Sequence, residues 1–449
     1  MFKQRREKFM GLMRGGIAII PANAEITRSA DGHYPFCQNK NFLYLTGFPE
    51  PDAIALLMPK HPEHRFVLFV RPRDKSREIW DGRRFGPEGA KSQFGADVAY
   101  TIAELDEVLP RYLENQDVLY HGFGNDPAFD ARVHRWLDMV RGKSRQGVIA
   151  PAEFVDPNEV IHEMRLIKDE HDLATMRAAA KISVGAHIRG MAVTKPGMFE
   201  YELGAEMEHH CRMRGSRNQA YSSIVGSGDN ANILHYREND RKMEDGDIVC
   251  VDLGCELDGY ASDITRAWPV NGRFTPEQKI IYDLVLKAHQ EAIKRAKAGN
   301  TIRNTHETAA KVLAQGLIDL GILKGDAETH MRVCIGDDKE TRFPEGQPVL
   351  KDFYMHGTSH WIGMDVHDVG RYRKGDQWRK LEPGMCFTVE PGLYFSVDNP
   401  RAPDRFRGIG IRIEDDIHVT RGEPEYITKG LPLTSADVEA ACRGDFPMP

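Results

Sequence analysis

The sequence predicts an α/β (α+β) protein with two domains. An N-terminal α/β domain is expected over residues 1–160, and a C-terminal domain of two pseudo-symmetric halves over residues 161–449. The length of 449 residues exceeds what one hydrophobic core usually organises. Short apolar runs alternate with helical patterns in the first third of the chain. A segment that recurs in the second half indicates that the C-terminal domain contains two related halves.

The elements of the first domain follow from the spacing of apolar residues. An amphipathic helix is expected over residues 4–14 and a strand over residues 17–20. The runs IALLMP and RFVLFV have strand length, and TIAELDEVLPRYLEN has helical spacing. Pro151 and Pro157 then interrupt the pattern, and a long helix is predicted after Asp169. These breakers place the domain boundary near residue 160.

Composition excludes several classes of function. The chain is 41% hydrophobic and 28% charged, with a net charge of −7, which argues against a nucleic-acid surface. No apolar run approaches the length of a membrane span, and the short apolar stretch near the amino terminus ends at Pro21. Seven scattered cysteines, an odd number, do not predict a disulfide framework. We expect a cytoplasmic protein with neither nucleic acid nor membrane as partner.

A repeat lies in the second domain. EDGDIVCVDLG, residues 244–254, aligns without gaps on EPGMCFTVEPG, residues 382–392. Each copy is expected to form a turn and then a strand that ends at a carboxylate. In each half a histidine precedes this carboxylate in the chain, and a second carboxylate follows it on a later strand. The two sets are His235, Asp252 and Asp263, and His360, Glu390 and Glu414. The polar stretches 325–350 and 396–408 are expected to be surface loops without regular secondary structure.

Five of these residues are potential metal ligands: Asp252, Asp263, His360, Glu390 and Glu414. Burying four carboxylates together is prohibitive unless cations neutralise them. Two divalent ions bridged by shared carboxylates would satisfy the set, and one imidazole among oxygens favours Mn, Co, Fe or Zn. A water bridging both ions would lose a proton near neutral pH and attack a carbonyl that the same ions polarise. The predicted class is a two-metal hydrolase.

Other polar residues surround the expected centre. His356, His360 and His367 fall within twelve positions and indicate the wall of a site. His235 and His367 are the candidates for a hydrogen bond to a developing oxyanion. Arg412, two residues before Glu414, is suited to hold a ligand carboxylate or a nearby Tyr, or else pairs with Asp415 at the surface. The thiols in the two repeat copies, Cys250 and Cys386, are expected to be small buried hydrophobes.

At these residues the chain resembles the metal-dependent Xaa-Pro aminopeptidases (aminopeptidase P) of bacterial type, in the pita-bread peptidase superfamily. The motifs are VDLGCELDGYASDITRAWPVNGRFT, HGTSHWIGMDVHDVG, EPGMCFTVEPGLYF and GIGIRIEDDI. In the first domain, YPFCQNKNFLYLTGFPEPDA and EIWDGRRFGPEGA resemble the amino-terminal domain of those enzymes. The resemblance implies a pita-bread catalytic domain that releases an N-terminal residue when proline is second, with two divalent ions, expected to be Mn²⁺.

Carried over by position, the resemblance implies a role for each residue. The implied metal ligands are Asp252, Asp263, His360, Glu390 and Glu414, with Asp263 and Glu414 as bridges. The implied catalytic residues are His235, His367, Arg412 and Glu390. Besides binding metal, Glu390 is implied to shuttle the proton of the bridging water. The implied substrate-binding residues are His356, Trp80 and Tyr394, with Tyr394 and Arg412 also supporting their neighbours. In family tetramers the segment of Trp80 reaches into a neighbouring active site, which implies a homotetramer or homodimer.

Four alternative functions share this resemblance. Prolidase uses the same five ligands but takes Xaa-Pro dipeptides only. Methionine aminopeptidase usually lacks so large an amino-terminal domain. Creatinase-like enzymes work without metals, and non-catalytic members of the fold, which bind peptides or proteins, have lost metal ligands. All five ligands are present here, which argues against the non-catalytic members. The similarity of the first domain and the segment of Trp80 favour an Xaa-Pro aminopeptidase over prolidase. The loop at 396–408 is longer than the family leads us to expect, so the preferred substrate length stays open.

Overall fold

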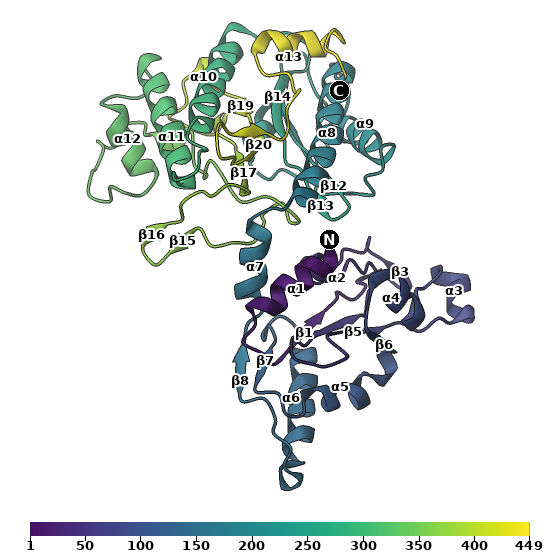
Figure 1. Ribbon diagram of the computed structural model, residues 1–449. Helices are drawn as coiled ribbons and strands as arrows, with labels where there is room; N and C mark the ends of the chain where they lie inside the picture. The colour runs from purple at the N-terminus through teal and green to yellow at the C-terminus, as the bar shows by residue number, and fades with distance from the viewer. Residues whose placement is uncertain (449) are drawn as a thin grey trace. The chain divides into compact units, whose positions relative to one another are not determined.

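The computed structural model describes residues 1–448 and divides the chain into two compact units (Figure 1). The first unit spans Met1–Arg165 and the second spans Leu166–Pro449. Helix α7 (Asn158–Leu166) runs across the point of division. The boundary expected between residues 160 and 161 therefore falls inside a helix, and not in a flexible linker.

A six-stranded mixed sheet forms the centre of the first unit, in the strand order β6-β5-β4-β1-β7-β8. The pairs β1–β4 and β4–β5 are antiparallel, and the other three pairs are parallel. The strands are β1 (Ile17–Pro21), β4 (Ile54–Leu57), β5 (Phe66–Val70), β6 (Val98–Thr101), β7 (Val118–Tyr120) and β8 (Glu153–Val155), with a separate hairpin of β2 (Thr27–Ser29) and β3 (Gly32–His33). The helices are α1 (Phe2–Leu12), α2 (Lys40–Thr46), α3 (Lys75–Asp81), α4 (Gly86–Phe94), α5 (Leu105–Leu113) and α6 (Pro127–Arg141).

The local sequence explains the first strands and helix. The apolar runs predicted as strands form β1, β4 and β5, and every residue of β4 and β5 is buried, as expected for strands covered on both faces. Helix α1 begins and ends two residues earlier than expected, at residues 2 and 12. The chain then turns at Gly16, whose φ is +75°. An added Cβ there would lie 2.1 Å from the carbonyl oxygen of Val118, so the turn requires glycine.

The second unit contains two halves, each built on short antiparallel strands. In the first half β11 lies between β10 and β14, and in the second β17 pairs with β20 while β18 pairs with β19. In the view of Figure 1, α8 and α9 lie on one side of these strands, and α10 and α11 lie on the other. The helices are α8 (Glu170–Val193), α9 (Glu200–Arg212), α10 (Pro276–Ile293), α11 (Ile302–Asp319), α12 (Ala327–Cys334) and α13 (Ser435–Cys442). The strands are β9 (Asn218–Gln219), β10 (Ile224–Ser227), β11 (Ile248–Asp252), β12 (Cys255–Leu257), β13 (Tyr260–Ala261), β14 (Thr265–Pro269), β15 (Arg373–Lys374), β16 (Gln377–Trp378), β17 (Cys386–Val389), β18 (Gly392–Phe395), β19 (Ile409–Arg412), β20 (Asp415–His418) and β21 (Glu425–Tyr426).

The repeated segments occupy equivalent places in the two halves. Strand β11 ends at Asp252, which pairs with Thr265 at the start of β14. Strand β17 ends at Val389, which pairs with Asp415 at the start of β20. An isolated β-bridge between Thr265 and Glu414 links the halves. The pseudo-symmetric architecture expected from the repeat is confirmed.

In the second unit the structure contains the helix predicted after Asp169 and a helix in a stretch that was predicted to be a loop. The helix predicted after Asp169 is α8, and its first turn is held by a capping box between Asp169 and Asp172. The stretch 325–350, expected to lack secondary structure, contains α12, because Asp326 caps a short helix whose Met331 packs into the core. The stretch 396–408 contains a short 3₁₀ turn at Asp404–Phe406 with a fully buried Phe406, so this prediction was also incomplete.

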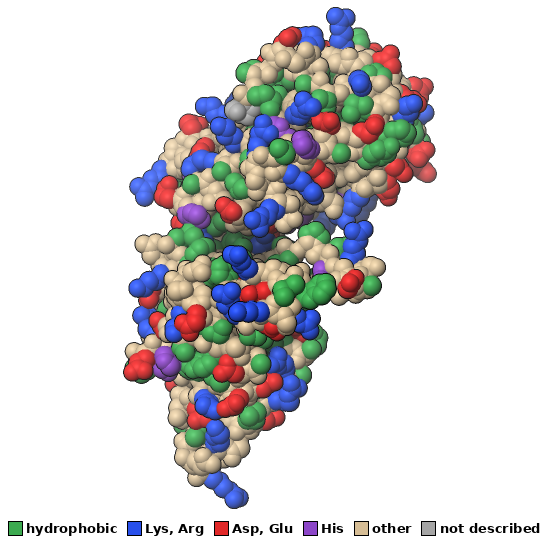
Figure 2. Space-filling model, turned by 90° about the vertical axis from the view of Figure 1, so that its right-hand side faces the viewer, with side chains coloured by type: hydrophobic (Ala, Val, Ile, Leu, Met, Phe, Trp, Pro, Cys, Tyr) green, Lys and Arg blue, Asp and Glu red, His purple; other side chains and the backbone are tan. Residues whose placement is uncertain are grey.

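The surface carries charges of both signs. Figure 2 shows Lys and Arg side chains interspersed with Asp and Glu over the face in view. Within residues 1–448, no helix combines the length and the apolar character needed to cross a membrane.

Candidate metal centre

The predicted ligands converge on one cleft of the second unit. The cleft has a volume of about 470 Å³. Its lining includes all five predicted ligands: Asp252, Asp263, His360, Glu390 and Glu414. It also includes the three histidines singled out from the sequence: His235, His356 and His367. Residues separated by up to 179 positions in the chain therefore share one wall.

The strands of the two halves place the carboxylates. Asp252 is the last residue of β11, and Asp263 lies two residues before β14, its antiparallel partner. Glu390 follows β17 directly, and Glu414 directly precedes β20. Each half thus contributes one carboxylate from the end of a strand and one from just before the paired strand. Because the pairs are antiparallel, both carboxylates of a half lie at the same end of its strands.

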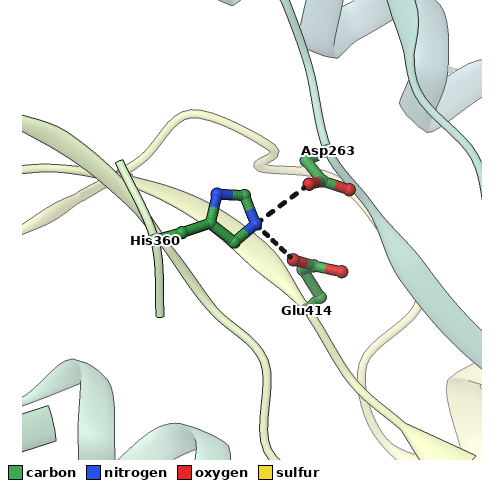
Figure 3. Close-up of side chains that lie close together, drawn as sticks. All are labelled: Asp263, His360 and Glu414. Carbon is green, nitrogen blue, oxygen red and sulfur yellow. Dashed lines mark ion pairs between the residues drawn. The ribbon is translucent and has the colours of Figure 1, made fainter. Parts of the chain in front are cut away.

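The imidazole of His360 faces the carboxylates of Asp263 and Glu414 (Figure 3). Its Nε2 is 3.4 Å from Asp263 Oδ2, 3.6 Å from Glu390 Oε1 and 3.9 Å from Glu414 Oε1. Its Nδ1 lies 3.0 Å from the carbonyl oxygen of Trp361. A proton on Nδ1 would donate to that carbonyl and leave Nε2 facing the carboxylates, the arrangement typical of a metal-bound histidine.

Burial governs the electrostatics of the cluster. It raises the pKa of Glu390 to about 7, and together with the charge of Asp263 it raises the pKa of Glu414 well above 4.5. Burial alone would lower the pKa of His360, but its hydrogen bond to Asp263 and the neighbouring carboxylates outweigh burial and raise it to about 9. The carboxylates therefore hold more negative charge than the nearby protein groups neutralise.

Arg412 supports the cluster from behind. Its side chain is buried, and its Nη2 donates to Asp252 Oδ2 at 2.7 Å. Its Nη1 donates to the hydroxyl of Tyr394 at 3.2 Å, and its Nε donates to Thr265 Oγ1 at 3.1 Å. Arg412 therefore holds the carboxylate of Asp252, a predicted ligand, and the hydroxyl of Tyr394, as the first of the two sequence interpretations expects. The alternative, a surface pair with Asp415, is wrong.

The remaining predicted site residues differ in position. His356 lines the cleft, and its Nε2 is 2.8 Å from the hydroxyl of Tyr394, which is itself buried behind His356. The ring of His367 lies 4.3 Å from that of His360 between centroids. Trp80 lies elsewhere, on α3 of the first unit, and is 84% exposed. It is not among the described residues that line the cleft.

Tyr221 was missed by the sequence analysis. Its hydroxyl oxygen is 2.6 Å from Asp252 Oδ1 and also 2.6 Å from Asp263 Oδ1. One hydroxyl proton can serve only one of these carboxylates at a time. Tyr221 lies 31 residues before Asp252 in the chain, outside either repeat copy, so neither spacing nor motif marked it.

The donor set fits divalent cations. Asp263, His360 and Glu414 each offer one ligand atom, and these three atoms lie within 4.8 Å of one another. Two atoms that each lie about 2.1 Å from a shared ion are roughly 3 Å apart, so the three residues are close enough to share one. Mixed carboxylate and imidazole donors suit Mn, Co, Fe or Zn. The excess of buried negative charge supplies the electrostatic reason for a cation at this place. The cleft and its donors define a metal-dependent hydrolase.

Comparison with known proteins identifies the family. Residues 174–421 match metallopeptidase family M24, and residues 2–120 match the aminopeptidase P N-terminal domain. The chain belongs to metallopeptidase family M24 and carries the N-terminal domain of the aminopeptidase P type. The resemblance inferred from the motifs is thereby confirmed.

Individual relatives match over their whole length. The Xaa-Pro aminopeptidase of Escherichia coli is 43% identical over 98% of this chain and 96% of its own. That of Haemophilus influenzae is 40% identical over the same shares of the two chains. The structure of Pseudomonas aeruginosa aminopeptidase PepP has a TM-score of 0.94 and 46% identity, covering 99% of this chain and 98% of its own.

Proposed function

We propose that this protein is an Xaa-Pro aminopeptidase, which hydrolyses the peptide bond between an N-terminal residue and a following proline. The observation that carries the proposal is the convergence of four carboxylates and His360 in one cleft of a family M24 fold. Relatives named Xaa-Pro aminopeptidase, at 43% and 40% identity over nearly the whole chain, supply the specificity for proline. A prolyl nitrogen carries no N–H and its ring fixes φ, so the substrate needs a dedicated enzyme.

Two divalent ions, with Mn²⁺ as the expected metal, would be held by the five ligands. The proposed bridges are Asp263 and Glu414, whose nearest ligand atoms belong to the group within 4.8 Å. When bound, the ions would polarise the scissile carbonyl and acidify a water. One solved relative is a zinc-substituted form of Escherichia coli aminopeptidase P in complex with product, at 42% identity and a TM-score of 0.92. This supports a divalent-metal centre of the same kind.

The protein's own groups would complete the reaction. Glu390 is proposed to accept the proton of the attacking water and to return it to the leaving prolyl nitrogen, which suits a carboxyl group whose pKa burial raises to about 7. His235 and His367, both lining the cleft, are proposed to donate hydrogen bonds to the carbonyl oxygen as it gains negative charge. Arg412 would hold Asp252 in place, and His356 would contact the substrate, with Tyr394 fixing its ring.

An N-terminal cleavage assay tests the function. Metal-stripped protein, with Mn²⁺ restored, would be compared on Xaa-Pro-Xaa tripeptides, Xaa-Pro dipeptides and Met-Ala-Xaa peptides. We expect Mn²⁺-dependent release of the first residue from the tripeptide, faster than cleavage of either control. Faster cleavage of the dipeptide would make the protein a prolidase instead. No cleavage of any of the three peptides would contradict the proposal that the protein is a peptidase.

We also propose that the protein forms a homotetramer or homodimer in which Trp80 contributes to substrate binding. Trp80 and Ile79 are 84% and 80% exposed on α3, a helix with no buried residue. A Trp80→Ala variant should raise KM for short peptides while sedimentation reports the assembly. Unchanged kinetics in an oligomer would reject the shared site. A cytoplasmic location remains a prediction.

A further inference from the structure

A fully buried carboxylate lies outside the metal cluster, at the start of α9. Glu200 is 0% exposed and is the first residue of that helix, where the helix dipole favours negative charge. Its Oε1 accepts the backbone N–H of Ser227 at 2.7 Å and the hydroxyl of Ser227 at 2.7 Å. Its Oε2 accepts the hydroxyl of Tyr236 at 2.8 Å and the backbone N–H of Arg241 at 2.9 Å.

These bonds fasten one segment of chain at both ends and near its middle. The segment runs from Ser227, the last residue of β10, to Arg241, shortly before β11. The ends are tied further, because the N–H of Glu200 donates to the carbonyl of Arg241 at 3.0 Å and Arg241 Nη1 donates to Ser227 Oγ at 2.8 Å. Asn230 adds a longer bond of 3.3 Å to Glu200 Oε1. The carboxylate of Glu200 thus contacts both ends of the loop and Tyr236 within it.

The segment carries a wall of the cleft. His235 lines the cleft from this loop, and its neighbour Tyr236 is the residue that donates to Glu200. The main regular structure in the segment is the 3₁₀ turn Gly228–Asn232, so a backbone ladder does not hold His235 in place. The bond from Tyr236 to Glu200 is therefore the side-chain tether at the residue next to His235.

We propose that Glu200 is a positioning residue for the peptidase reaction: by closing the segment from Ser227 to Arg241, its carboxylate holds His235 where it meets the substrate carbonyl. The inference rests on the proposed function, because it uses the role assigned there to His235. Glu200 itself contacts neither the ligands nor the substrate site. It acts through Tyr236 and the loop ends.

Glu200→Gln is the informative substitution. The side chain keeps its shape, but one carboxylate oxygen becomes an NH₂ group that faces two donors, so two hydrogen bonds are replaced by repulsion. If the carboxylate acts through His235, the loss should appear in kcat and not in KM. It should also vanish once the imidazole of His235 has been removed.

A double-mutant cycle measures this dependence. kcat and KM on an Xaa-Pro-Xaa tripeptide would be determined for wild type, Glu200→Gln, His235→Ala and the double variant, together with bound metal and thermal unfolding. We expect Glu200→Gln to lower kcat on the order of tenfold, as when an outer hydrogen-bond partner of a site residue is lost. The double variant should match His235→Ala within about twofold. The proposal would be overturned by an unchanged kcat in Glu200→Gln. It would also be overturned if the kcat loss of the double variant equalled the product of the losses of the two single variants.

Two further variants make the result specific. Tyr236→Phe removes a single donor and serves if Glu200→Gln folds poorly or loses metal. Tyr236→Phe should lower kcat only when His235 is present. An equal loss of kcat with and without His235 would overturn the proposal.

Asp326→Asn is the matched control, because Asp326 also accepts a backbone N–H and a hydroxyl, from Thr329, but on α12. It should leave kcat unchanged. If the wild type cleaves no Xaa-Pro peptide, both the proposed function and this inference are wrong. If the wild type is active but the kcat losses of the two single variants multiply in the double variant, only this inference is wrong.

Discussion

Glu414 and Asp415 are neighbours in the chain, and each is only 2% exposed, yet their surroundings differ. Glu414 faces the metal cluster, where burial and the charges of Asp263 and Glu390 raise its pKa well above 4.5. Asp415 faces the other way, as successive residues of extended chain do. It accepts two hydrogen bonds from Arg266, at 3.0 and 2.9 Å. Burial alone would raise its pKa, but the charge of Arg266 and the bonds from His289 and Thr428 together outweigh burial and lower the pKa to about 2.

The difference separates a structural carboxylate from a functional one. Asp415 also accepts the hydroxyl of Thr428 and lies 3.1 Å from His289 Nε2, so its charge is balanced inside the protein. Glu414 accepts one hydroxyl, from Thr265, and otherwise lies among carboxylates and His360. Equal burial therefore says little about role. What distinguishes the two sites is whether the protein itself supplies the compensating charge.

The largest expected effect comes from Glu414→Gln. Activity should be lost entirely, because a proposed bridging ligand is removed. The metal-free variant should be as stable as the wild type or more stable at pH 7, because a carboxyl group whose folded pKa is raised above 4.5 costs stability once it ionises. Peptidase assays, bound metal and chemical unfolding would be measured together. Turnover near that of wild type would remove Glu414 from the ligand set.

Asp415→Asn should produce the opposite pattern. Removing one partner leaves Arg266 buried without its counter-charge, so the free energy of unfolding should fall by about 3–5 kcal/mol. Metal binding per folded molecule should change little. Urea unfolding at pH 7 gives the stability, and metal analysis of the folded fraction gives the second quantity. A variant with wild-type stability would mean that Asp415 is not the structural member of the pair.

His367→Ala tests a cleft residue that is not a proposed ligand. Loss of one hydrogen-bond donor to a developing oxyanion lowers turnover by about 10²–10³-fold. The metal content should equal that of the wild type, and the stability should hardly change. Steady-state kinetics with metal analysis separate the roles, since loss of metal in this variant would place His367 among the ligands.

The smallest effect is expected at a partly exposed pair. Glu425 accepts hydrogen bonds from Arg177, at 2.7 and 2.8 Å, and lies 2.8 Å from His418 Nδ1, and its side chain is 33% exposed. The bond from Arg177 lowers the pKa of Glu425 from 4.5 to about 2. Because the folded pKa is depressed, the stabilisation exists above pH 4.5 and disappears as the pH falls toward 2.

Glu425→Gln should therefore cost about 1 kcal/mol or less at pH 7, since solvent screens the pair. The difference from wild type should shrink in acid. Unfolding curves of both proteins at pH 7 and at the lowest pH where they remain folded would show it. A deficit that grows in acid would contradict the assigned direction.

Much of the site could be predicted from the sequence because it depends on short segments of chain. The apolar runs before Asp252 and Glu390 predicted strands, and the repeat predicted two related halves with a shared centre. Four carboxylates on such strands predicted cations that neutralise them. The motifs then supplied the family, which composition and periodicity could not.

The remaining assignments depended on distant parts of the chain. Arg412 meets Asp252 across 160 residues, and Arg266 meets Asp415 across 149, so sequence spacing did not separate the site arginine from the structural one. Tyr221 and Glu200 carry no motif and are defined only by what folding brings beside them. The sequence by itself predicted the first strands, the two halves and the candidate ligands, because apolar periodicity and the repeated motif are local features of the chain. Only the tertiary structure decided which partners neutralise each buried group, because hydrogen bonds and ion pairs form between groups adjacent in space, regardless of their separation along the chain.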